Sequence, residues 1–94
     1  MASVPVVLRQ IRRARRNVEP PESRFERFRK EYEQTLIAAH KLAGEEALDD
    51  VAEWAITWTT REGRLPDPAR FRRETRRLLV ERGVEIPDDS VLTD

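Results

Sequence analysis

Apolar residues recur every three or four positions along most of the chain, which is the spacing of an α-helix. Four stretches show this spacing: 4–18, 24–43, 45–62 and 68–82. No stretch alternates apolar and polar residues in the manner of a half-buried strand. The pattern therefore predicts an all-α fold, a small bundle of three to four helices.

Cap and turn residues separate the predicted helices. Ser23 and Glu26 have the spacing of a capping box, in which each side chain satisfies a free backbone N–H of the other. Gly44 follows the second apolar stretch and is suited to end a helix. Asp67 precedes Pro68, so a carboxylate that caps the helix is followed by a proline, which the first turn tolerates. These residues predict where each helix begins and ends.

The chain divides into four parts by composition. We expect a basic amphipathic helix in 1–18, a proline-containing linker at 19–23, a helical core in 24–84 and an extended acidic tail in 85–94. The apolar pattern leaves open whether the first helix packs on the core.

The composition narrows the class of protein. The chain has 94 residues, 18 basic and 18 acidic residues, and no cysteine. This length fits one domain with a thin core, to which a partner subunit would add buried surface. No stretch approaches the roughly 20 apolar residues that a membrane span requires. We therefore expect a cytoplasmic protein that has no disulfides and no membrane span.

The charges are unevenly distributed although they sum to zero. Residues 1–24 carry a net charge of +4, residues 25–43 of +1, residues 44–58 of −5, residues 59–83 of +4 and residues 84–94 of −4. Stripes of opposite charge favour contacts with one another, either within one chain or between copies.

The sequence offers no motif for catalysis. The three glycines form no phosphate-binding loop, and no motif places a carboxylate to orient the single histidine, His40. Glu46, Asp49, Asp50 and Glu53 share helical spacing, but a helix dipole and nearby arginines account for them better than a metal does. We therefore expect a protein that is not an enzyme and that binds neither a cofactor nor a metal ion.

The leading functional hypothesis is a non-enzymatic interaction module, which self-associates or docks on a protein partner. The predicted helix 45–62 is apolar over more than half its circumference, and its two tryptophans lie one turn apart. We expect one tryptophan to be buried and the other to lie at a subunit contact. The candidate interface comprises the following residues: Trp54, Trp58, Val7, Leu8 and Ile11.

The alternative hypothesis is a nucleic-acid-associated protein that places arginines on phosphates. The candidate phosphate-binding residues are Arg9, Arg12, Arg13, Arg16, Arg72, Arg73, Arg76 and Arg77. The first helix also has the composition of a membrane-surface helix or a transit peptide. An ordinary helix, packed by its apolar stripe and paired through its arginines with acidic residues, explains the same pattern.

Overall fold

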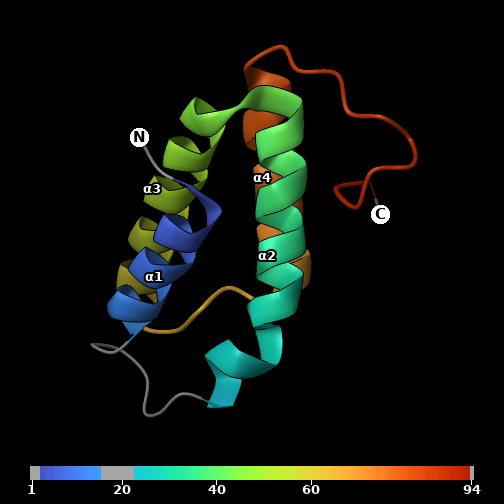
Figure 1. The fold of residues 1–94 in the computed structure, drawn as a ribbon. Helices are drawn as coiled ribbons and strands as arrows, with labels where there is room; N and C mark the ends of the chain where they lie inside the picture. Colours follow the sequence, from blue (N-terminus) through green and yellow to red (C-terminus); the bar gives the residue numbers. More distant parts are fainter. Residues whose placement is uncertain (1–2, 16–22, 94) are drawn as a thin grey trace.

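The described part of the chain forms four α-helices (Figure 1). The structure, a computed structural model, describes residues 3–15 and 23–93. The helices are α1 (Val4–Arg15), α2 (Ser23–Ala43), α3 (Glu45–Glu62) and α4 (Pro68–Glu81). No strand occurs in these two ranges. The predicted all-α class is therefore confirmed.

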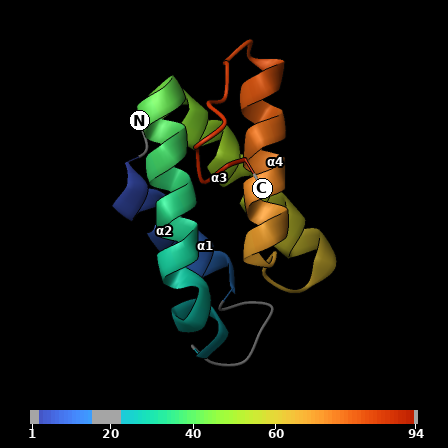
Figure 2. The same ribbon diagram turned by 90° about the vertical axis from the view of Figure 1, so that its right-hand side faces the viewer.

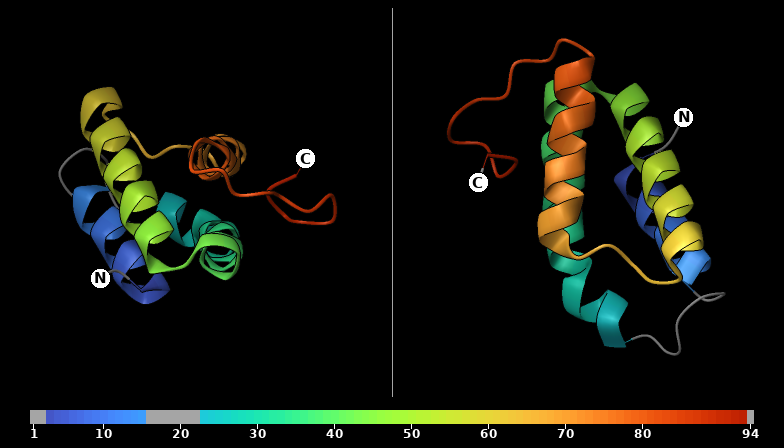
Figure 3. Two further views of the ribbon diagram at one scale, coloured as in Figure 1. Left: turned by 90° about the horizontal axis from the view of Figure 1, so that it is seen from above. Right: turned by 180° about the vertical axis from the view of Figure 1, so that it is seen from behind.

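The helices are arranged so that α1 and α4 lie on opposite sides of the molecule (Figure 3). Helix α1 packs on α2 and α3, and α4 packs on the same two helices. Within the described ranges α1 and α4 do not contact each other. The first helix is thus part of the bundle, and its outer face is separated from that of α4 by the pair α2 and α3.

Local signals in the sequence fix two of the helix ends. The carboxylate of Asp67 accepts a hydrogen bond from the backbone N–H of Arg70 over 2.9 Å, and Pro68 occupies the first turn of α4. At the end of α3, Gly63 adopts the left-handed conformation with φ of 73°, and its N–H donates to the carbonyl of Thr59. A residue with a Cβ rarely adopts this conformation, so glycine favours the end of the helix here.

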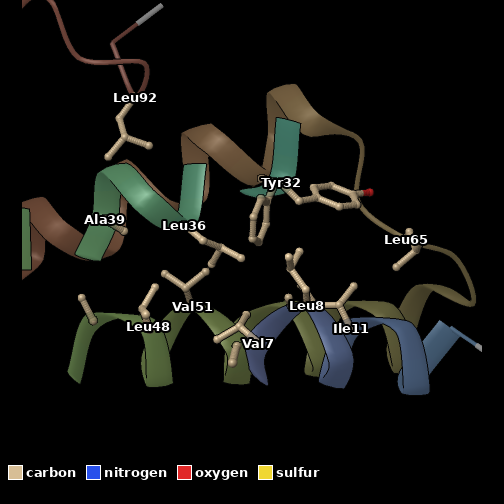
Figure 4. Packing of buried hydrophobic residues seen from close by; sticks show 14 of the residues in the cluster. Val7, Leu8, Ile11, Tyr32, Leu36, Ala39, Leu48, Val51, Leu65 and Leu92 are labelled. Carbon is tan, nitrogen blue, oxygen red and sulfur yellow. The ribbon is translucent and has the colours of Figure 1, made fainter. Parts of the chain in front are cut away.

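A single apolar core joins all four helices (Figure 4). Its largest fully buried side chain is Tyr32 of α2, whose hydroxyl donates a 2.6 Å hydrogen bond to the carbonyl of Pro66 in the α3–α4 connection. The ring of Phe71 on α4 meets Tyr32 edge to face, with centroids 5.2 Å apart. Burying these rings and the aliphatic residues around them is the main force that holds the bundle together.

The segment after α4 folds back along the outer side of α2 and α4 (Figure 2). It contains turns but neither helix nor strand over residues 83–93. Its residue Leu92 is only 1% exposed and belongs to the core. The apolar pattern did not predict this anchor.

Some predicted features lie outside the described residues: the linker around Pro20 and Pro21, the last residues of the predicted first helix, and the side chain of Ser23 in the capping box. Among the residues described, no helix is long and apolar enough to cross a membrane.

Candidate interaction surface

A groove runs along the surface between α1 and α2. Its base is formed by Leu8 of α1 and Phe25 of α2, which are almost completely buried, while Ile37 is 38% exposed at one end. The complete lining comprises Val4, Pro5, Leu8, Arg9, Arg12, Phe25, Arg29, Glu33 and Ile37. The groove therefore has an apolar floor and a charged rim.

The rim of this groove is mainly basic. Arg9 and Arg29 are exposed, and neither makes an ion pair with any described residue. Arg12 lies 3.5 Å from a carboxylate oxygen of Glu26, and its guanidinium is 5.7 Å from the centre of the Phe25 ring. Arg9 and Arg29 thus leave two guanidinium groups on the rim that remain available to an anionic ligand.

The residues predicted to form an apolar interface are placed mostly in the core. Val7, Leu8 and Ile11 of α1 are buried. Trp58 is also buried, and the guanidinium groups of Arg64 and Arg70 lie over its ring at 5.0 and 5.6 Å. These four side chains contribute to the stability of this chain and offer almost no free surface to a partner.

Trp54 is the candidate interface residue with the most free surface. It is half-buried, with its ring 6.1 Å from that of Trp58 and 6.3 Å from that of Phe71. A shallow hollow beside it is lined by Asp50, Glu53, Trp54, Thr57 and Leu78. The expected subunit contact at this tryptophan stays a prediction.

The residues predicted to bind phosphate do not form one surface. Arg9, Arg12 and Arg13 belong to α1, whereas the arginines of the second group belong to α4 on the other side of the molecule. Arg16 lies outside the described residues. A strand of nucleic acid that lay along one group would therefore not reach the other group on the same face.

Two of the four candidate arginines of α4 have carboxylate partners. Arg77 donates 2.7 Å hydrogen bonds to Glu74 and Glu81, and these bonds, above all that to Glu74, raise the pKa of its guanidinium. Arg72 lies 3.7 Å from a carboxylate oxygen of Glu31 on α2. Arg73 and Arg76 make no ion pair within the described ranges.

Two acidic residues of α3, Glu46 and Asp50, pair with Arg82, the residue directly after α4. Arg82 donates a 2.8 Å hydrogen bond to the carboxylate of Asp50 and lies 3.8 Å from that of Glu46. In the described part of the chain no group of three or more acidic, histidine or cysteine side chains is arranged to hold a metal ion. His40 is exposed on α2.

Sequence reasoning missed the part that α2 plays in the groove. Phe25, Arg29, Glu33 and Ile37 recur at every fourth position, which places them along one line of the helix. Ile37 lies beside the buried stripe that contains Leu36, so an apolar residue next to a complete stripe was the available signal. The position of α1 beside this line required the structure.

Comparison of the chain with protein-family models, curated protein sequences and solved structures gives no match. Inference about its function therefore rests on its own geometry.

Proposed function

We propose that the protein is a non-enzymatic interaction module that binds an acidic amphipathic helix of a protein partner in the groove between α1 and α2. The observation that carries the proposal is the combination of an apolar floor with exposed, unpaired arginines on the rim. Arg9 belongs to α1 and Arg29 to α2, so the two cations come from the two helices that form the groove.

The dimensions of the groove suit a helix. The line from Phe25 to Ile37 covers thirteen residues of α2, and its two ends lie about 18 Å apart at the helical rise. A helix of about three turns fits this length and presents apolar residues at every third or fourth position to the floor. Acidic residues beside its apolar stripe would then meet the arginines, which pair with carboxylates through two parallel hydrogen bonds.

A peptide-binding titration tests the proposal. The probe is a fluorescently labelled synthetic peptide of about 14 residues, with leucines on one helical face and glutamates elsewhere. A control peptide carries lysine in place of each glutamate. By fluorescence anisotropy the acidic peptide binds and the basic peptide does not, because the rim repels the latter.

Charge reversal identifies the surface that binds the peptide. The double variant Arg9→Glu/Arg29→Glu weakens binding of the acidic peptide by at least about tenfold. The matched control Arg13→Glu/Arg73→Glu changes the net charge equally, but neither residue lines the groove. The control alters only the long-range electrostatic attraction of the protein for the peptide. Its affinity for the acidic peptide therefore stays within about threefold of that of the wild type.

Three results would overturn the proposal: no binding of the acidic peptide, equal binding of both peptides, or equal loss in the two double variants. A labelled single-stranded RNA and a DNA duplex are titrated in parallel. If these bind with a steep salt dependence and both double variants weaken them equally, the arginines act as phosphate contacts and the nucleic-acid hypothesis replaces this one.

A further inference from the structure

The segment after α4 holds an apolar side chain on the surface. Hydrogen bonds close a turn: the backbone N–H of Ser90 donates to the carbonyl of Pro87, and that of Thr93 donates to the carbonyl of Ser90. Leu92 points toward α2 and is buried (Figure 4), while Val91 is 47% exposed. The anchored turn therefore fixes Val91 outward.

Val91 and residues of α2 line a common hollow, and the lining of this hollow is called the patch below. A hollow between the turn and the helix is lined by Gln34, Ile37, Ala38, Lys41, Leu42, Asp89, Ser90 and Val91. Ile37 and Val91 are two of the three large apolar side chains that are exposed in the described ranges. The third, Val80, does not line this hollow.

The lining of this hollow includes one cation and one anion. Lys41 lies on α2 and Asp89 on the turn, both are exposed, and neither makes an ion pair with any described residue. A patch with an apolar centre and one charge of each sign is complementary to itself after rotation by 180°. The Lys41 of one copy then meets the Asp89 of the other, and this contact occurs twice.

We propose that two copies of this chain associate through this patch, with Ile37 and Val91 at the centre and two Lys41–Asp89 pairs at the rim. Burial of exposed apolar surface drives the association, and the charge pairs fix its two-fold orientation. The patch shares Ile37 with the α1–α2 groove, but Lys41 and Asp89 line only the patch, so charge reversal at these two residues tests the dimer separately from partner binding in the groove.

Charge reversal tests the proposal through the mass of the full-length protein, measured by analytical ultracentrifugation at up to about 1 mM. The wild type is dimeric, with a mass that falls on dilution. Lys41→Glu alone and Asp89→Lys alone each weaken the dimer by at least about tenfold, because like charges then meet at both contacts. An equimolar mixture of the two variants restores a dimer, since every contact between the two different chains is again complementary.

Matched variants control for a general effect of charge. Lys30→Glu and Asp88→Lys carry the same changes at exposed positions of α2 and of the tail that do not line the patch, and they stay dimeric. Helical content by circular dichroism checks that every variant is folded. The proposal is overturned if the wild type is monomeric at every concentration or if the mixture of the two variants stays monomeric. It is also overturned if the control variants dissociate as much as the Lys41 and Asp89 variants do.

Discussion

Tyr32 joins three parts of the molecule through a single side chain. Its ring contacts that of Phe71 on α4, and its hydroxyl reaches the carbonyl of Pro66 in the α3–α4 connection. Pro66 is itself buried, so its carbonyl has no access to water as an alternative partner. A buried carbonyl that loses its donor raises the free energy of the folded state.

Tyr32→Phe should therefore lower the free energy of unfolding by about 1 to 2 kcal/mol, since the ring is kept and only the hydrogen bond is lost. Urea unfolding, followed by circular dichroism, measures the change. Thr35→Val is a matched control, because the Thr35 hydroxyl bonds only to the Glu31 carbonyl of its own helix. An unchanged unfolding midpoint in Tyr32→Phe would contradict the role assigned to this bond.

Removal of the Thr75 hydroxyl should not lower the free energy of unfolding, in contrast to removal of the Tyr32 hydroxyl. Its side chain on α4 is fully buried, and its hydroxyl has no hydrogen-bond partner among the described residues. Thr75→Val removes a polar atom from the core with little change in volume, so we expect the stability to stay equal or to rise by about 1 kcal/mol. A clear loss of stability in the same urea experiment would show that the hydroxyl has a partner, such as an internal water.

At the scale of the helices, the first turn of α4 depends on Asp67. The carboxylate satisfies the backbone N–H of Arg70, which has no partner within the helix. Asp67→Ala should lower the free energy of unfolding by about 1 kcal/mol. Asp67→Asn should keep most of this stabilisation, because asparagine caps a helix equally well. Equal losses in the two variants, measured by thermal unfolding, would show that the charge matters rather than the hydrogen bond.

Local rules predicted the helical elements because the signals lie within a few residues of the ends they determine. Asp67 caps α4 and Gly63 ends α3 through contacts inside one or two turns. Leu92 could not be predicted in this way, since it sits in a segment without apolar periodicity and is buried by a helix almost fifty residues earlier in the chain. Its burial depends on tertiary packing alone.

The candidate site was less predictable than the elements. The apolar stripe of α1 was recognised, but a stripe does not reveal whether it packs on its own chain or on another. In the structure, Val7 and Ile11 are buried in the core of their own chain. The groove beside them depends on which flank of α1 faces α2, and only the three-dimensional arrangement supplies this relation.

At the scale of the whole molecule, the position of α1 determines what its arginines can do. Helices α2 and α3 separate it from α4, so the arginines of α1 and those of α4 lie on opposite sides of the molecule. On the side of α1 the basic residues border an apolar groove. On the side of α4, Arg72 and Arg77 are paired with carboxylates, whereas Arg73 and Arg76 make no ion pair with a described residue, and none of these four arginines lines the groove. This difference between the two sides favours a protein ligand at the α1–α2 groove.

The most direct test of this account is a titration of the isotopically labelled protein with the acidic amphipathic peptide, followed by two-dimensional ¹H–¹⁵N NMR. We predict that the amide signals of residues lining the groove, such as Arg9, Arg29 and Ile37, shift and saturate together, while those of Arg73 and Arg76 on α4 stay in place. Shifts confined to the arginines of α4, or an unchanged spectrum at saturating peptide, would contradict it.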